Sequence, residues 1–186
     1  MIDPNILQEL KTFNWQTIIE YGISLNDLNG RQWRWLKGLT AELTVEKHSK
    51  NNLVYVGEDH KDFDWPRQGK TVELKSQLSQ PMYTKKGRLT KNFTIKFNNS
   101  NGTNKKAQLD PAEVCNLILV VRNNGAFVID QQTVIDNSYK TGDGFGVKVD
   151  ADQIVEVSGW IKPTTQYQSK IKENVIDVLR QDIPSL

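Results

Sequence analysis

Five consecutive apolar residues, Leu117 to Val121, constrain the fold of this chain more than any other feature. A continuous apolar run of this length is typical of a strand buried on both faces, because a half-buried strand alternates apolar and polar residues. A partner strand is expected over 126–129, after a turn at Asn123-Asn124-Gly125. The chain should therefore contain a well-covered central sheet.

The remaining elements follow from residue spacing and turn chemistry. Apolar residues at helical spacing predict helices over 5–21 and 31–48, with Gly22 ending the first. Asn51-Asn52 should end the second helix. Strands are expected over 53–56, 62–65, 70–76 and 92–97, polar loops over 98–104 and 137–146, and a short helix at Asp110-Pro111.

We expect one domain over residues 1–186, since no linker or repeat divides the chain. Its parts are N-terminal helices over 1–50, a core over 51–160 and a C-terminal helix over 165–183. This order gives a central mixed β-sheet flanked by helices, in an α/β or α+β class.

Composition excludes several classes of protein. Hydrophobic residues make up 37% of the chain and charged residues 25%, as in globular proteins. With one Cys and two His, the chain has too few ligands for a structural zinc site of the usual kind and cannot form an internal disulfide. No apolar stretch approaches the roughly 20 residues that cross a membrane, and no secretory signal precedes the first helix. A single Cys fits a reducing compartment, and we expect a cytoplasmic protein.

Charge is distributed unevenly along the chain. The net charge is only +2, yet residues 74–109 contain no Asp or Glu and carry eight Lys or Arg. Such a segment is either a solvated surface or a site for a polyanion. The segment directly follows a strand with catalytic residue types, which raises the second interpretation, with DNA as the polyanion, to equal standing with the first.

That strand carries Glu73-Leu74-Lys75. Successive side chains of a strand point to opposite faces, so Glu73 and Lys75 share one face while Val72 and Leu74 anchor the strand in the core. Phosphodiester hydrolysis gives such a pair a role. A carboxylate binds Mg²⁺, and the lysine orients or deprotonates the attacking water or stabilises the developing charge.

A second carboxylate is expected on the preceding strand of the hairpin. Asp62 begins that strand and is preferred, with Asp64 on the same face as the alternative. The pattern acid-x-Lys also occurs at Glu9-Leu10-Lys11 and Asp59-His60-Lys61, but these lie in a predicted helix and a predicted turn. A salt-bridged surface hairpin is the competing interpretation of the whole motif.

Asp62 together with Glu73-Leu74-Lys75 resembles the motif of the PD-(D/E)xK nuclease superfamily, which includes most type II restriction endonucleases. The resemblance covers residues 38–77 and implies a restriction-endonuclease-like core. In this family an upstream helix often supplies a further carboxylate near the metal. Glu42, within Gly38–Leu43, is the matching residue. The proline that the family has before its first Asp is replaced here by Lys61.

The chain is also similar to the small subunits of heterodimeric type IIS restriction endonucleases. This similarity implies a bacterial protein with a larger partner subunit. The larger subunit would recognise double-stranded DNA and cut one strand, while the small subunit cuts the other. The sequence has no helix-turn-helix or zinc-finger motif of its own, which agrees with recognition by a partner. The alternatives are a homodimeric restriction enzyme, a repair nuclease or resolvase, and a non-catalytic DNA-binding or assembly subunit.

Further residues are expected to contact the DNA, with Tyr83 offering a stacking face. They are Gln77, Tyr83, Lys85, Lys86, Arg88 and Lys91.

Overall fold

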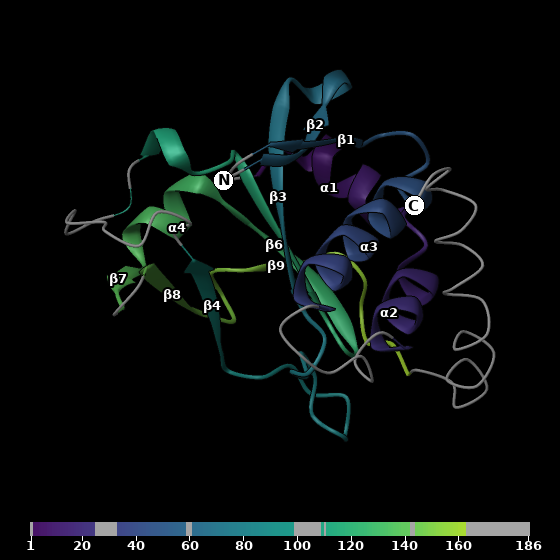
Figure 1. The fold of residues 1–186 in the computed structure, drawn as a ribbon. Helices are drawn as coiled ribbons and strands as arrows, with labels where there is room; N and C mark the ends of the chain where they lie inside the picture. The colour runs from purple at the N-terminus through teal and green to yellow at the C-terminus, as the bar shows by residue number, and fades with distance from the viewer. Residues whose placement is uncertain are drawn as a thin grey trace.

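The fold is described by a computed structural model over residues 2–24, 33–58, 61–98, 109, 111–141 and 144–162. Its main sheet has six strands in the order β1-β2-β3-β5-β6-β9, and a second sheet has three in the order β4-β8-β7 (Figure 1). Within the main sheet β3 and β5 are parallel, and the other neighbours are antiparallel. The general α+β class with a mixed sheet is therefore confirmed.

The strands of the main sheet are β1 (Val54–Glu58), β2 (Lys61–Trp65), β3 (Lys70–Gln77), β5 (Leu117–Arg122), β6 (Gly125–Asp130) and β9 (Val155–Glu156). The second sheet consists of β4 (Asn92–Asn98), β7 (Ser138–Lys140) and β8 (Gly144–Asp150). The helices are α1 (Pro4–Lys11), α2 (Trp15–Ser24), α3 (Trp33–His48) and α4 (Gln131–Asp136), with short 3-10 turns η2 (Pro66–Gln68) and η3 (Pro111–Glu113).

Two apolar cores lie on the two faces of the main sheet. On one face Phe63, Trp65 and Leu119 pack with residues of α1, α2 and α3. On the other face Ile118 and Phe127 pack with residues of β4 and β8. The predicted helices α1, α2 and α3 thus flank one face of the main sheet, while the second sheet and Val134 of α4 pack against the other face (Figure 1).

The predicted central hairpin is confirmed. All six residues of β5 are buried, as are the first five of β6. The two strands pair from Leu117–Asp130 to Arg122–Gly125. Burial on both faces explains why this segment is continuously apolar.

The predicted helix over 5–21 is two helices. Asn14 accepts a hydrogen bond of 3.3 Å from the Thr17 amide and so starts α2. The Trp15 indole donates to the Leu10 carbonyl at the end of α1 (2.8 Å). Gly22 does not end α2, which continues to Ser24. A Cβ at this glycine would lie 2.6 Å from Leu78 Cδ1, so the position serves close packing.

Other boundaries differ from expectation in definable ways. The predicted second helix is confirmed as α3, and Lys50 and Asn51 break the chain there with left-handed backbones. The predicted loop over 137–146 is wrong, since β7 and the start of β8 lie within it. The predicted C-terminal helix over 165–183 and the loop residues 99–104 lie outside the described residues. No described helix is long and apolar enough to span a membrane.

Candidate active site

The site is built on the hairpin of β2 and β3. Their register pairs Phe63 with Val72 and Trp65 with Lys70, and Gly69, with a φ of +58°, closes η2 between the strands. Phe63 and Val72 belong to the core under the helices. Strand alternation therefore places the side chains of Asp62 and Glu73 on the opposite face.

Glu73 and Lys75 form a short ion pair on β3. Glu73 is 7% exposed. The Lys75 ammonium lies 4.7 Å from the centroid of the Phe97 ring on β4, so an aromatic face covers the other side of the cation. The predicted alternation of Glu73 and Lys75 against Val72 and Leu74 is confirmed, since the two apolar residues lie in the helix-side core.

Asp62 reaches across the hairpin to the strand that carries this pair. Its carboxylate accepts a hydrogen bond of 2.6 Å from the Leu74 amide, the residue between Glu73 and Lys75. Burial raises the pKa of Asp62, while the Leu74 amide and the charge of Lys75 act in the opposite direction. The Asp62 carboxylate is thus bonded to the backbone of β3 between Glu73 and Lys75.

Glu42 comes to the same place from α3. Burial is the main reason that its pKa rises to about 6, and the negative charge of Asp62 adds to the rise. The Tyr55 hydroxyl donates a hydrogen bond to it, and this bond and Lys75 both lower its pKa. Glu42, Asp62 and Lys75 therefore interact electrostatically, although they come from a helix and two different strands.

Asp64 lies apart from this cluster. Its carboxylate is 3.4 Å from the Lys61 ammonium, and its side chain is 43% exposed. It stands opposite Thr71 in the hairpin, two residues closer to the turn than Asp62. The structure thus brings Asp62, and not Asp64, together with Lys75 and Glu42.

The carboxylates of this site are the groups that would have to hold a divalent cation. Within the described ranges no group of three or more His, Cys, Asp or Glu is arranged to hold a metal ion. Glu73 is neutralised by Lys75, and one Asp62 oxygen is bonded to the Leu74 amide. Burial raises the pKa of both Asp62 and Glu42, and the negative charge of Asp62 adds to the rise at Glu42. Carboxylate oxygens are the ligands that a hard cation such as Mg²⁺ prefers.

Gln77 continues the same face of β3. Its amide donates to the Thr94 carbonyl on β4 (3.0 Å), and its carbonyl oxygen accepts from Arg122 on β5 (2.9 Å). Both functional ends of the side chain are occupied by protein groups. A direct contact from Gln77 to DNA would have to displace one of them.

The structure does not support Tyr83 as a stacking residue. It is 6% exposed, and its hydroxyl donates a short hydrogen bond to Glu156. Its ring packs against the backbone of Gly125, where a Cβ would lie 2.7 Å from Tyr83 Cε2. The four expected cations of this segment, in contrast, are all exposed: Lys85, Lys86, Arg88 and Lys91.

Arg122 is a residue that the sequence did not single out. It is 4% exposed, lies opposite Gln77 in the parallel register, and stacks over Phe93 and Phe127 at 4.9 and 5.9 Å from the ring centroids. Burial lowers its pKa to about 10. The only signal in the sequence was its position directly after the apolar run. An arginine at the end of a buried strand needs specific partners for its charge, which marks it as a residue with a defined role.

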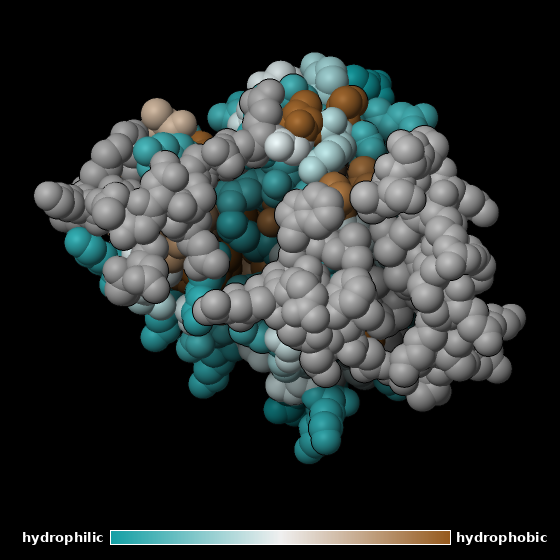
Figure 2. All heavy atoms as spheres, in the orientation of Figure 1, coloured by the Kyte–Doolittle hydropathy of each residue, from teal (hydrophilic) through white to brown (hydrophobic). Residues whose placement is uncertain are grey.

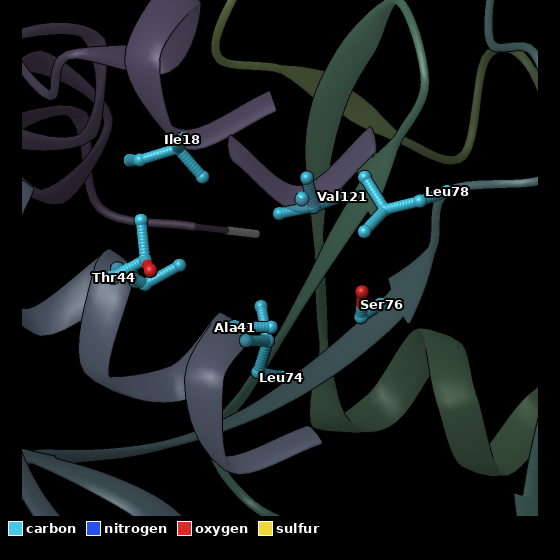
Figure 3. Close-up of a pocket in the computed structure, with 9 residues that line it drawn as sticks. Ile18, Ala41, Thr44, Leu74, Ser76, Leu78 and Val121 are labelled. Atoms are coloured by element: carbon cyan, nitrogen blue, oxygen red, sulfur yellow. The ribbon is translucent and has the colours of Figure 1, made fainter. Parts of the chain in front are cut away.

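An apolar hollow between α2, α3 and the sheet lies on the other face (Figure 3). None of its lining residues is charged: Ile18, Gly22, Ala41, Thr44, Val45, Leu74, Ser76, Leu78 and Val121. It has no group for acid–base or metal chemistry. The surface view instead shows hydrophilic residues gathered in a recess over the middle of β3 (Figure 2).

The chain matches no protein-family model, and neither curated proteins nor solved structures give a significant match.

Proposed function

We propose that the chain is a magnesium-dependent endodeoxyribonuclease with its active site at Asp62, Glu73 and Lys75. One observation carries the proposal. The carboxylates of Asp62 and Glu42 meet the Glu73–Lys75 pair at one place on the hairpin, although burying so many charges together is costly. Clusters of carboxyl groups with perturbed pKa values are typical of functional sites.

Each residue has a chemical role in this proposal. Asp62 and Glu73, with Glu42 beside them, would hold Mg²⁺, which when bound acts as a Lewis acid on the phosphate and on water. Lys75 is held by Glu73 and by the Phe97 ring, so its ammonium has a fixed direction. It is placed to orient the attacking water or to stabilise negative charge on the phosphate.

The order of elements supports a restriction-endonuclease-like core. A helix carrying Glu42 precedes an antiparallel hairpin carrying the acids and the lysine, and the next strand of the sheet runs parallel to β3. We propose that this core is the cleavage subunit of a type IIS restriction endonuclease and that a larger partner reads the sequence. A homodimeric restriction enzyme or a resolvase would use the same site.

One observation favours a second function. The Glu73–Lys75 ion pair and the Leu74–Asp62 hydrogen bond give both carboxylates of the motif a partner without a metal. A non-catalytic DNA-binding or assembly subunit would have the same contacts.

Calorimetric titration of the chain with Mg²⁺ separates the two functions without requiring cleavage or a partner. We expect the wild type to bind Mg²⁺ and Glu73→Gln to bind at least about tenfold more weakly, since loss even of a group that only orients a metal ligand costs about 10- to 100-fold. Asp64→Asn is the matched control and should bind as the wild type does. Equal binding by Glu73→Gln would reject the metal site.

A further inference from the structure

The basic segment after β3 forms a turn with a defined structure. The Thr84 amide donates to the Arg88 carbonyl (2.8 Å), and the Thr90 amide donates to the Met82 carbonyl (3.0 Å). Tyr83 and Leu89 form a single antiparallel bridge below the tip. We call residues 84–88 the basic turn, since it carries Lys85, Lys86 and Arg88.

Asn124 fastens the base of this turn to the sheet. Its side-chain oxygen accepts from the Met82 and Tyr83 amides (2.7 and 3.0 Å), and its amide donates to the Tyr83 carbonyl (2.7 Å). Asn124 itself lies between β5 and β6, the most buried strands of the fold. The basic turn is thus attached to the rigid centre of the protein.

An exposed tryptophan lies against the basic turn. Gly87 has a φ of +73°, and a Cβ there would lie 2.6 Å from Trp160 Cε3, so the indole rests on the backbone of the turn. The Trp160 side chain is nevertheless 42% exposed. The Lys162 ammonium lies 5.1 Å from the centroid of its ring.

The charge around this tryptophan is positive. Lys85, Lys86 and Arg88 are exposed on the turn that it touches, and Lys162 is beside its ring. Glu156, four residues before Trp160, has one carboxylate oxygen bonded to the Tyr83 hydroxyl. An exposed aromatic face among cations is the combination that binds single-stranded nucleic acid, through stacking of a base and contacts to phosphates.

We infer that Trp160 and the basic turn bind an unpaired DNA strand, with a base stacked on the indole and phosphates on Lys85, Lys86 and Arg88. The choice of DNA rests on the proposed nuclease function. Strand β3 leads from Glu73 towards this surface, and Gln77 lies about 13 Å along it from Glu73 at a rise of ~3.3 Å per residue. A single strand bound here would extend along β3 toward the proposed active site.

In this proposal Trp160 stacks on a base, the role that was predicted for Tyr83 from the sequence. Tyr83 is buried beneath the turn, and its hydroxyl is bonded to Glu156. The two aromatic residues therefore have different functions: Tyr83 packs the base of the turn, and Trp160 offers a ring to a ligand.

Fluorescence anisotropy with a labelled oligo(dT) single strand tests this inference. The titrations are made in EDTA, so that cleavage plays no part. Trp160→Ala should weaken binding about tenfold, in the range that one stacked base contributes. Trp160→Phe, which keeps a stacking face, should restore most of the affinity. Tyr139→Ala removes an aromatic residue of similar exposure (45%) on β7 and should bind as the wild type does.

A second measurement addresses the cations. Replacing both Lys85 and Lys86 with Ala should reduce the slope of log K against log salt by about 1.4, because a single strand releases ~0.7 counterion per phosphate contact. Unchanged affinity of Trp160→Ala with its fold intact by circular dichroism would overturn the inference. So would absence of oligonucleotide binding by the wild type, or a loss of affinity in Trp160→Ala that is as large for the matching duplex as for the single strand. Mg²⁺ binding at Glu73 would stand in each of these cases, so the two proposals fail separately.

Discussion

Glu42 is the carboxyl group of the site whose raised pKa lies in a range where the pH dependence of stability can reveal it. Its pKa rises from 4.5 to about 6, chiefly through burial and secondly through Asp62. Between these pH values the folded protein binds more protons than the unfolded chain, so the free energy of unfolding falls as the pH rises through this window. Ionised Glu42 therefore destabilises the metal-free protein at neutral pH.

We expect Glu42→Gln to remove this dependence. In metal-free buffer the melting temperature of the wild type should fall relative to the variant by about 2–4 °C between about pH 4 and pH 7. This corresponds to ~1 kcal/mol, a reduced value because the side chain is partly solvent-accessible. Differential scanning calorimetry measures it. Parallel pH profiles for the two proteins would show that Glu42 is not perturbed.

Asp62 and Asp64 give the sharpest comparison between neighbouring residues. Both face the same side of β2, but only Asp62 accepts from the Leu74 amide, whereas Asp64 pairs with Lys61. Asp62→Asn should lower Mg²⁺-dependent DNA cleavage by at least about 100-fold, since a metal carboxylate and its charge are lost. Asp64→Asn should change it less than about threefold. The reverse order of effects in a plasmid-nicking assay would reject Asp62 as the first carboxylate.

The sequence could predict the shared face of Glu73 and Lys75 because strand alternation is a local rule. It could not separate Asp62 from Asp64, because both obey that rule equally. The choice depends on which backbone amide is free on the neighbouring strand and on where Lys61 lies, and both are facts of tertiary structure. Arg122 escaped notice for the same reason, since its three acceptors lie on other segments.

At the scale of elements, α1 supports the hairpin of β2 and β3 through Glu9. Its carboxylate accepts from the Trp65 indole (3.2 Å) and from the Gln68 amide (2.9 Å). Trp65 is fully buried, so its indole N–H would lose its partner if Glu9 were removed. This contact joins the first helix to the turn between β2 and β3.

We expect Glu9→Ala to lower the free energy of unfolding by about 1–3 kcal/mol, the cost of an unsatisfied buried donor. Gln8→Ala, on the exposed side of the same helix, should lie within about 0.5 kcal/mol of the wild type. Urea denaturation measures both. A Glu9→Ala variant as stable as Gln8→Ala would show that the indole finds another acceptor.

Elements with strong local signals were predictable, and those that depend on distant contacts were not. The hairpin of β2 and β3 and the buried pair β5 and β6 follow from alternation, apolar runs and turn residues. The division between α1 and α2 depends on Trp15 reaching back to Leu10. The pair of β7 and β8 lies in a stretch rich in Gly and polar residues. At Gly146 a Cβ would collide with the Tyr139 ring at 2.4 Å, so this glycine is explained only by its partner strand.

At the scale of the whole molecule, Arg122 connects the two sheets and the basic segment. Its guanidinium donates to the Pro81 carbonyl (3.2 Å), to Gln77 (2.9 Å) and to the Thr94 carbonyl (3.3 Å). These acceptors belong to the segment before the basic turn, to β3 and to β4. A planar group with several fixed donors suits this junction better than an ammonium.

Arg122→Lys should therefore lower the free energy of unfolding by about 2 kcal/mol, through loss of the fork and of stacking over Phe93 and Phe127. Arg88→Lys, an exposed change of the same kind, should alter it by less than about 0.5 kcal/mol. Equal stability of the two variants by urea denaturation would mean that packing alone holds the sheets together.

Cleavage of supercoiled plasmid DNA tests the central claim most directly. The full chain, alone and with any subunit that co-purifies with it, is compared with Glu73→Gln in Mg²⁺ and in EDTA. We expect the wild type to nick DNA only with Mg²⁺ and Glu73→Gln to be slower by at least about 100-fold, since a metal carboxylate is lost. Equal cleavage by both proteins, or cleavage that persists in EDTA, would contradict a metal-dependent nuclease centred on Asp62, Glu73 and Lys75.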